Sequence, residues 1–388
     1  MAAVLLLWGV FLAAWLTLHW AILPHIDEWR PQIEKYAGEA IGLKLSLGEI
    51  RVQSGGWVPA FEVRDLRVFD PQGREALYLA RVHTALAPQS LLALSLRFRQ
   101  VLVDGARLEV RRDAGGQWHV AGLPWGGGGD NRWRDWFLEQ HEFVVRGGEL
   151  QWTDEQRDAP PLVLTQLDLV LRNGLRRHKL RIDATPPPDW GQRFSLRGQF
   201  QQPLLAPAGE LQRWSGTLFA DFPQVDAAQL RRRLTLPVDI GQGEGALRAW
   251  VDVADGAARK ATLDFALQAV AVRLQPELPL LQLQQLRGRL DVERDAGGAR
   301  LHAQDLSFLT DDGVAWPAGD LKVAWRQAQD LHQPWTTATP VTGGDLSSER
   351  INLDALSRVA EHAPLGAPLR ALLASLAPRG RLDSLQAE

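Results

Sequence analysis

An alternation of apolar and polar residues dominates the chain from about residue 43 to about residue 330. Clusters of Gly, Pro, Asn and Asp separate the alternating segments, as they do at the ends of strands. Clear examples run over residues 180–184, 194–200 and 247–253. Because a strand places successive side chains on opposite faces, this period of two predicts a mainly β protein with short helices, whose sheet is apolar on one face and solvated on the other.

The alternation slips by one residue at recurring places. In FEVRDLRV, residues 61–68, the apolar residues stand at i, i+2, i+5 and i+7, with the polar pair Arg64 and Asp65 between them. The same spacing starts at residues 45, 96, 162 and 265, with looser copies from 77, 281 and 301. A two-residue hairpin turn would need Asn, Asp or Gly, which most of these pairs lack. We therefore favour a β-bulge, or an equivalent kink, at each slip, which bends the strand and returns i+5 and i+7 to the face of i and i+2.

A sheet that is bent repeatedly around its apolar face curls around that face. The result is an elongated, curved, antiparallel-rich sheet that either forms a hydrophobic groove or closes over a core, and the pattern fits both. If it is a groove, the apolar residues of the slips line it: Leu45, Leu47, Ile50, Val52, Phe61, Val63, Leu66, Val68, Leu96, Phe98, Val101, Val103, Leu162, Leu164, Leu167, Leu169, Phe265, Leu267, Val270 and Val272.

Short signals mark the turns and helices of this sheet. Residues 108–118 and 290–300 both place Asp-Ala-Gly-Gly between two strand patterns, which predicts hairpins. Short helices are expected from Pro88, from Asp130 and from Asp226. Beyond residue 350 the pattern becomes helical, and Leu382 and Leu385 then indicate the start of one more element. We therefore expect residues 43–345 to form the groove domain and 346–388 a helical segment with the start of a further repeat, in a chain that continues.

The first residues have the length and composition of a membrane anchor. Residues 4–23 are free of formal charge unless His19 is protonated, and about 20 helical residues cross a bilayer core. A cleaved signal peptide is the alternative, but the run is long for one, lacks a basic n-region and has no small-residue cleavage site before Pro24. We expect a transmembrane anchor at 1–25 and an amphipathic juxtamembrane helix at 26–42. Trp20, Trp29 and Tyr36 would lie at or beyond the membrane interface.

Composition and motifs narrow the functional classes. A net charge of −3 and 388 residues with no cysteine favour neither nucleic-acid binding nor a thiolate metal site. His83, His119, His178 and His302 are scattered without ligand spacing, so no metal site or cofactor is indicated. The glycine runs at 126–129 and from Gly241 lack the features of phosphate loops.

The remaining charged groups are read as solvated or capping residues. The acidic pairs Asp154–Glu155 and Asp311–Asp312 stand beside turns, and Arg231 to Arg233 stand on a short helix. No catalytic residue is indicated, and we expect no enzyme activity.

Taken in order, several segments resemble the amino-terminal part of the AsmA-like family, most closely its long YhdP-type members. They are the span with its following helix, residues 42–73, the unit at 91–123, the helix and strand at 135–155, and residues 177–200. GEGALRAWVDV from Gly243 and the closing segment from Leu369 are also similar. The family's basic cytoplasmic stub is missing before the span.

The resemblance implies a protein held in the inner membrane of a Gram-negative bacterium by a single span, with its bulk in the periplasm. Members are similar to the bridge-like lipid transfer proteins, whose curved β-sheet carries acyl chains in a hydrophobic groove. The implied function is movement of phospholipids toward the outer membrane, in support of its barrier. The implied partners are phospholipids, the inner membrane, and outer-membrane or periplasmic proteins bound through the part of the chain beyond residue 388.

A second class of function fits the same pattern. If the apolar faces are packed shut, the protein is an envelope-assembly scaffold that binds protein partners through its loops and transports nothing. A periplasmic hydrolase has no motif in its favour.

Overall fold

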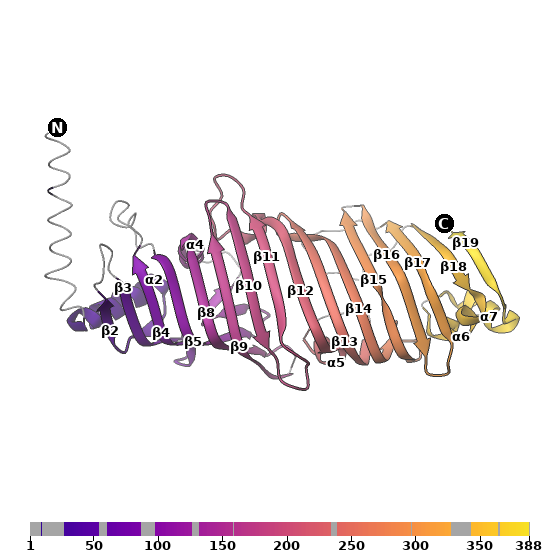
Figure 1. Cartoon of the computed structure of the whole chain (residues 1–388), viewed down its shortest axis with the longest axis horizontal. Helices are drawn as coiled ribbons and strands as arrows, with labels where there is room; N and C mark the ends of the chain where they lie inside the picture. The colour runs from indigo at the N-terminus through magenta and orange to yellow at the C-terminus, as the bar shows by residue number, and fades with distance from the viewer. Residues whose placement is uncertain are drawn as a thin grey trace. The chain divides into compact units, whose positions relative to one another are not determined.

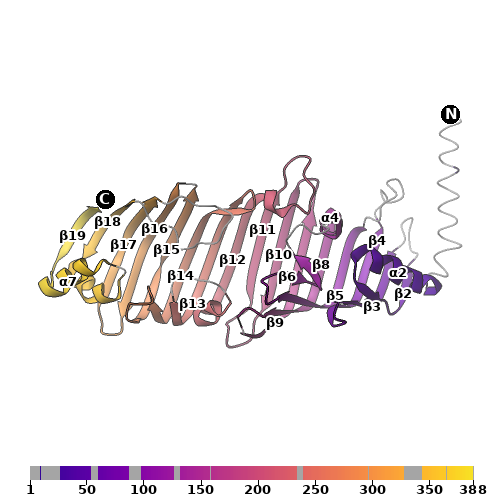
Figure 2. The same cartoon turned by 180° about the vertical axis from the view of Figure 1, so that it is seen from behind.

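The computed structural model describes residues 9, 27–53, 60–86, 98–125, 132–157, 159–233, 239–295, 297–326, 343–363 and 365–387. The chain divides into two compact units, Met1–Leu175 and Arg176–Glu388. Both are mainly β and are built on open sheets, so the predicted fold class is confirmed at that level (Figures 1 and 2). Among these described residues no helix is long and apolar enough to cross a membrane. Apart from Gly9, the predicted span at 4–23 lies outside them.

Unit 1 contains one sheet with helices at its margins. Its elements are α2 (Arg30–Ile41), β1 (Lys44–Ser46), β2 (Ile50–Gln53), β3 (Ala60–Phe69), β4 (Glu75–Leu86), β5 (Phe98–Arg112), β6 (Trp118–Val120), β7 (Leu123–Trp125), α4 (Arg132–Glu139), β8 (Glu142–Asp154) and β9 (Ala159–Asn173). β1 and β2 both pair with β3, and the sheet continues through β4, β5 and β8 to β9. β5 and β8 are parallel, whereas the other pairs of this unit are antiparallel within the described residues.

Unit 2 is an antiparallel meander in which consecutive strands are neighbours. Its elements are β10 (Arg177–Thr185), β11 (Phe194–Gln201), η3 (Leu211–Arg213), β12 (Ser215–Asp226), α5 (Ala227–Arg231), β13 (Asp239–Ala254), β14 (Ala257–Arg273), β15 (Leu281–Asp295), β16 (Gly298–Thr310), β17 (Ala315–Arg326), β18 (Gly343–Asn352), α6 (Leu353–Val359), η4 (Ala360–His362), α7 (Ala367–Leu376) and β19 (Arg381–Ala387). The pairing runs from β10 to β19 in chain order.

The predicted turns and helices that lie in the described residues are confirmed. Each Asp-Ala-Gly-Gly segment joins two antiparallel strands, β5 to β6 and β15 to β16. The helix expected from Asp130 is α4, and Asp226 caps α5 by accepting a hydrogen bond from the amide of Ala228 at 2.8 Å. The helix expected from Pro88 lies outside the described residues, and the late element indicated by Leu382 is β19.

The parallel pairing of β5 and β8 depends on the long connection between them. This connection carries β6, β7 and α4, and α4 packs its aromatic side chains on the two strands. The ring centroids of Phe98 and Trp136 are 6.1 Å apart, and those of Phe137 and Phe143 are 4.9 Å apart. The buried Gln140 accepts a hydrogen bond from the Phe98 amide at 2.8 Å, which satisfies the first amide of β5.

The slip in β3 is a kink and not the favoured bulge. The β3–β4 register continues unchanged from Arg64↔Arg81 to Leu66↔Leu79, so β3 gains no residue relative to β4. Asp65 instead takes a left-handed conformation with φ of +50°. β4 slips at the same place, since Leu79 and Val82 both pack in one core cluster on either side of Ala80 and Arg81. Matched slips keep the two strands in register.

The matched slip continues from β4 into β5 and β8, and β9 also has a left-handed residue, at a register shift with β8. Gly105 in β5, Gly147 in β8 and Gln166 in β9 have φ of +68°, +57° and +49°. The β5–β8 register is also unchanged from Asp104↔Arg146 to Arg107↔Glu149, on either side of the two glycines. A Cβ atom on Gly105 would lie 3.4 Å from that of Ala80. We call Asp65, Ala80, Gly105 and Gly147 the kink row.

Elsewhere the slips do shift the register, as a bulge requires. Shifts occur beside Arg99 in the β4–β5 pair, at Thr165–Gln166 in β8–β9, at Gln284 in β15–β16 and at Gln304–Asp305 in β16–β17. Ala269 and Asp305 each have φ of +49°. LSLGEIRV departs from its prediction, because it is not one bent strand but β1 and β2, separated at Gly48 and Glu49. There the amide of Gly48 donates to the carbonyl of Arg64 at 3.0 Å.

Candidate functional site: the apolar faces and their rim

The apolar face of unit 1 is built from rows of side chains that cross the strands in register. One row joins Val63, Val82, Val103, Val145 and Leu169 through direct pairings from β3 to β9. Val103 at its centre is fully buried, at 0% exposed. Further rows on the same face are Phe61, Thr84, Val101, Phe143 and Leu171, and Val68, Leu77, Leu108, Leu150 and Leu164.

The opposite face of unit 1 carries the charges. Glu62 accepts a hydrogen bond from the Nε of Arg64 at 2.7 Å, and Arg81 on the neighbouring strand lies 3.7 Å from the same carboxyl oxygen. The hydrogen bond from Arg64 lowers the pKa of Glu62 against the opposing effect of its desolvation. The two faces therefore differ sharply in polarity, as the alternation predicts.

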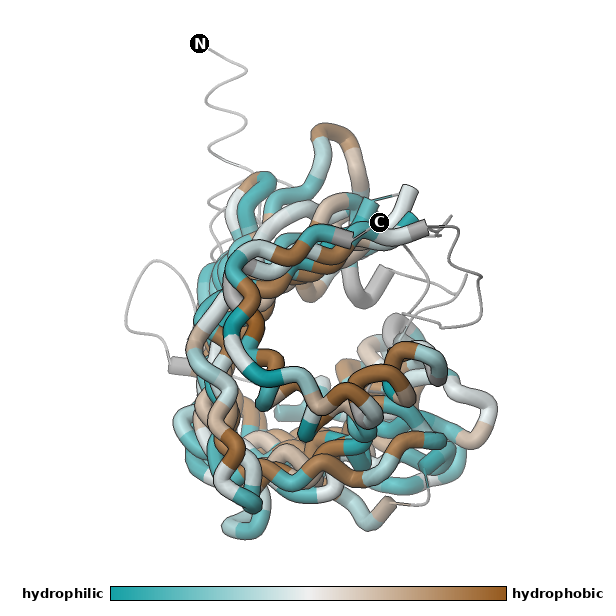
Figure 3. The backbone as a smooth tube through the Cα atoms, turned by 90° about the vertical axis from the view of Figure 1, so that its right-hand side faces the viewer, coloured by the Kyte–Doolittle hydropathy of each residue, from teal (hydrophilic) through white to brown (hydrophobic). Residues whose placement is uncertain are grey.

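Unit 2 repeats this arrangement over more strands. Its apolar face has rows that run through Ile182, Leu196, Ala220, Ala249, Leu263, Leu290, Ala303 and Leu321, and through Leu180, Gly198, Leu218, Val251, Ala261, Val292, Leu301, Val323 and Leu346. Seen end-on, the strands of this unit, nearest the viewer, are bowed (Figure 3). The polar face bears cross-strand ion pairs such as that of Arg289 with Asp264, with an Nε to Oδ1 distance of 2.6 Å.

Much of the apolar face of unit 2 remains partly open to solvent. Leu218, Val251 and Val292 are neither buried nor fully exposed, and the same holds for Leu301 and Val323 in the same row. A second layer packed on this face would bury such side chains, as it does in a sandwich core. An extended apolar surface of this kind, left half-exposed, is typical of a binding surface.

The structure brings most of the predicted groove residues together within each unit. Val63, Phe98, Val101, Val103 and Leu169 share one cluster, and Phe265, Leu267, Val270 and Val272 share another. Leu45, Ile50 and Val52 join the first sheet by pairing with Val68, Val63 and Phe61. Leu47 is buried, Leu66, Leu164 and Leu167 occupy unit 1 strands, Leu162 is buried in β9, and Leu96 lies outside the described residues.

Sequence reasoning from the slips missed other members of the same faces. Val82, Phe143 and Val145 in unit 1, and Leu218 and Val251 in unit 2, have the same placement. The sequence signal for these residues was the ordinary alternation of apolar and polar residues, without a slip. Once the strand register is known, that alternation places them on the same apolar face.

One end of the apolar face of unit 1 is rimmed by arginine, aspartate and tryptophan. Leu108, Val110 and Arg112 are alternate residues of β5, so all three lie on its apolar face. Arg112 pairs with Asp154 on β8 and with Trp118 on β6. Asp154 is buried, at 2% exposed, although its position beside a turn indicated a solvated side chain. Its Oδ2 lies 3.8 Å from Nη1 of Arg112 and 3.4 Å from Nε of Arg157. We call Arg112, Asp154, Arg157, Trp118 and Trp152 the rim cluster.

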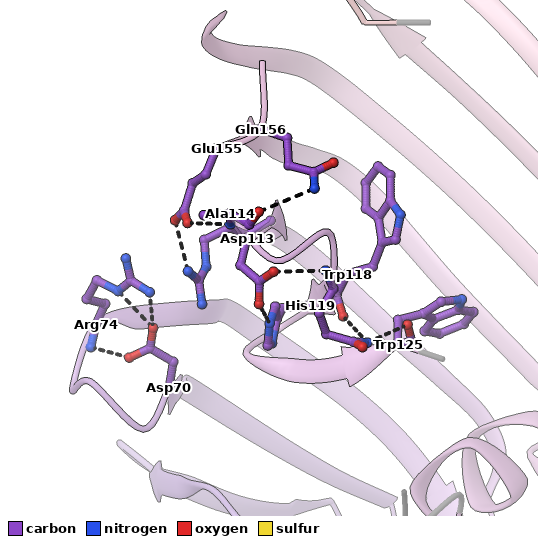
Figure 4. A network of polar contacts seen from close by, with 11 residues as sticks. Asp70, Arg74, Asp113, Ala114, Trp118, His119, Trp125, Glu155 and Gln156 are labelled. Atoms are coloured by element: carbon purple, nitrogen blue, oxygen red, sulfur yellow. Dashed lines mark hydrogen bonds and ion pairs between the residues drawn. The ribbon is translucent and has the colours of Figure 1, made fainter. Parts of the chain in front are cut away.

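Polar contacts fix the hairpin that carries Trp118 (Figure 4). Glu155 accepts a hydrogen bond from Arg111 at 2.9 Å and one from the amide of Ala114 at 3.2 Å. His119 and Asp113 are 2.9 Å apart across the base of the turn. The hydrogen bond from Arg111 lowers the pKa of Glu155, and the contact with His119 lowers the pKa of Asp113.

Comparison with known proteins identifies the family. The family model described as YhdP protein matches residues 1–388. The chain belongs to the YhdP family. Over 329 residues it is 25% identical to the Intermembrane phospholipid transporter YhdP of Escherichia coli (strain K12), in a match that covers 80% of this chain and 24% of that protein. This YhdP-family chain therefore spans about a quarter of the length of that relative.

The predicted interface aromatics of this YhdP-family chain lie on or beside α2. Trp29, at the amino end of the helix, is 52% exposed and Tyr36 is 70% exposed, while Trp20 lies outside the described residues. The helix is held against the sheet, because Glu34 accepts a hydrogen bond from the amide of Leu47 at 2.7 Å and Arg30 donates one to the carbonyl of Gly48 at 2.7 Å. Their contact with a membrane stays a prediction.

Proposed function

We propose that this chain carries phospholipids, with the acyl chains lying on the apolar face of each unit. The observation that carries the proposal is the in-register apolar rows that remain partly exposed, as in the row from Leu218 to Val323. Family membership and the name of the Escherichia coli relative, a phospholipid transporter, support the same class of cargo.

Burial of acyl chains supplies the affinity without a specific pocket. Each methylene removed from water contributes about 0.8 kcal/mol, whichever apolar side chain it contacts. A row of side chains that repeats from strand to strand offers similar contacts at each step, so a bound chain can move along the face without a large barrier. Headgroups stay at the edge of the face, because burial without hydrogen-bonding partners would cost several kcal/mol.

The finer parts of the proposal concern the location and the route. The apolar faces would act as a groove in the periplasm, with residues 4–23 anchoring the chain in the inner membrane and the transport directed to the outer membrane. No bond-making chemistry is involved. The exposed Trp29 before α2 and Tyr36 on α2 are suited to the membrane interface beside such an anchor.

Site-specific photocrosslinking tests the proposal with neighbouring residues on opposite faces. A photoreactive residue that replaces Leu218 lies in the apolar row. One that replaces Thr217 lies on the polar face of the same strand, opposite Asp252. Leu164 and Val163 form the equivalent pair in β9, since Val163 pairs with Gln151. The full chain is crosslinked in cells, and phospholipid adducts are detected by mass spectrometry.

We expect phospholipid adducts at Leu218 and Leu164 and few at Thr217 and Val163. Equal phospholipid labelling on both faces would contradict a groove and indicate non-specific contact with bilayers. Protein adducts alone at Leu218 and Leu164 would instead support the envelope-assembly scaffold and refute lipid carriage.

A further inference from the structure

The rim cluster stands where a headgroup would emerge if an acyl chain lay on the apolar face of unit 1. Leu108 and Val110 precede Arg112 on the same face of β5, and Leu150 and Trp152 precede Asp154 on β8. The polarity of this face therefore changes within one step of the alternation, from apolar side chains to an arginine. A phospholipid has the same change of polarity between its acyl chains and its phosphate.

Arg112 is held in place with hydrogen-bonding capacity to spare. Its guanidinium lies 5.7 Å from the centre of the Trp118 ring, within the range of a cation–π contact. Its ion pair with Asp154 is 3.8 Å long from Nη1, beyond hydrogen-bond distance. Its Nε is buried and makes no hydrogen bond among the described residues, so a ligand would meet the terminal nitrogens of the guanidinium. The side chain is 28% exposed, so solvent or a ligand can reach it.

Charge in the rim cluster favours an anion. Two arginines against one aspartate leave a formal charge of about +1 on this cluster. The second arginine, Arg157, is 25% exposed and is held by the same carboxylate. Asp154 is 1% exposed in its side chain, so it positions the two guanidinium groups and is shielded from a ligand.

The surrounding backbone keeps this geometry rigid. Gln117 donates from Nε2 to the carbonyls of Trp118 and Trp125 at 3.3 and 3.0 Å, which locks the β6–β7 hairpin. Trp118 and Trp125 are directly paired, and both indoles project to the same side of the hairpin (Figure 4). Trp118 also packs on Trp152, with ring centroids 5.8 Å apart. Indole rings beside an arginine suit the boundary between acyl chains and headgroups.

We infer that the rim cluster binds the phosphate of a phospholipid headgroup through Arg112, with Arg157 beside it, while the acyl chains lie over Val110 and Trp152. The inference rests on the proposed function, because it needs acyl chains on this face. Arginine suits the role, since its planar guanidinium can donate two parallel hydrogen bonds to phosphate oxygens.

The test compares two lipids that have the same acyl chains, using the whole 388-residue protein in detergent. The probes are a short-chain phosphatidylcholine and the diacylglycerol that lacks its phosphate, with inorganic phosphate as a competitor. The variants are R112Q, the charge-retaining R112K, and the control R107Q. Arg107 lies on the same strand but on the polar face, where its guanidinium stacks on Tyr78 at 4.4 Å.

We expect R112Q to weaken phosphatidylcholine binding by about tenfold to a hundredfold, the range for hydrogen bonds to a charged group. Diacylglycerol binding should not change, R112K should restore part of the loss, and R107Q should match the unmodified chain. Millimolar inorganic phosphate should compete weakly, because it lacks the acyl chains.

Other outcomes separate the two proposals. If R112Q weakens both lipids equally, or neither, the headgroup inference is overturned while acyl-chain binding stands. If inorganic phosphate alone binds as well as phosphatidylcholine, the cluster is a free-phosphate site and the inference is wrong. If the unmodified chain binds neither lipid, the proposed function fails, and the headgroup inference fails with it.

Discussion

Replacing Ala269 with glycine should stabilise the sheet of unit 2, although glycine in a strand is ordinarily destabilising. Ala269 has φ of +49°, a conformation that costs an L-residue about 1–2 kcal/mol and costs glycine almost nothing. Its side chain is exposed, so the substitution removes little packing. Against this gain stands the larger chain entropy of glycine, about 0.5–1 kcal/mol. The net expectation for Ala269→Gly is a stabilisation of about 0–1.5 kcal/mol.

Ala266→Gly is the matched control, because the two alanines share a strand and an exposure class. Ala266 is also exposed on β14, but it has an ordinary extended backbone. Ala266→Gly should therefore destabilise by about 0.5–1 kcal/mol. The entropy of glycine is common to both variants, so the difference between them isolates the left-handed conformation, at about 1–2 kcal/mol.

Native-state hydrogen exchange of the full chain measures this difference locally. The amides to follow are those of β14 and β15 on either side of the kink, where Gln268 pairs with Gln285 and Val270 pairs with Leu283. A difference of 1–2 kcal/mol corresponds to about 5-fold to 30-fold in protection between the two variants. Equal losses of protection in both variants would refute a left-handed residue at position 269, and with it the kink.

Three further predictions concern the stability of the folded chain. Val103→Ala removes two buried methyl groups at 0% exposure and should cost about 2 kcal/mol, seen as a lower urea midpoint at unchanged slope; no shift would show that the site is not packed. Gln140→Ala leaves the Phe98 amide without its 2.8 Å acceptor and should cost about 1–3 kcal/mol, with the β5 amides near Phe98 exchanging first. His178 is stacked on Trp214 at 4.1 Å, and its burial lowers its pKa, opposed by the hydrogen bond with Gln202. The unfolded chain therefore binds the proton first, so stability should be full above about pH 6.5 and fall as the pH drops below it, with a flatter profile for His178→Asn.

The faces of the sheets were predictable, whereas their pairing was not. Alternation places Val63 and Val101 on the apolar faces of their own strands whichever strands lie beside them, because the period of two is a property of a single strand. The parallel pairing of β5 with β8 depends on a connection that carries a hairpin and a helix, and no local signal in FVVRGGEL reveals it. The slips were visible as spacing, but the backbone conformation was hidden, since Asp65 and Ala269 are not residues that favour positive φ as strongly as glycine.

The rim cluster was hidden for a different reason. Asp154 stands next to a turn, where acidic residues ordinarily cap or solvate, and only its register with Arg112 shows that it lies on the apolar face. A signal existed in the alternation of β5, which continues past Val110 to Arg112 without a slip. To interpret this alternation, one must also know that β8 pairs with β5 and that Asp154 lies on the same face as Arg112.

Alignment of the kinks matters more for an open sheet than for a closed one. If Asp65 alone slipped, residues 66–69 would shift by one against β4, as at a bulge, and Leu66 and Val68 would no longer stand opposite the apolar residues Leu79 and Leu77. Because Ala80, Gly105 and Gly147 slip in the same row as Asp65, the strands β3, β4, β5 and β8 change step together, and their rows on both sides of the kink stay apolar. A packed core could tolerate one misaligned strand by rearranging its second layer. In unit 1, α4 covers part of the apolar face at Phe98 and Phe143. Where acyl chains would lie instead of such a layer, the continuity of the rows depends on register. The kink row is therefore a feature expected of a sheet that bends while keeping one uninterrupted apolar face.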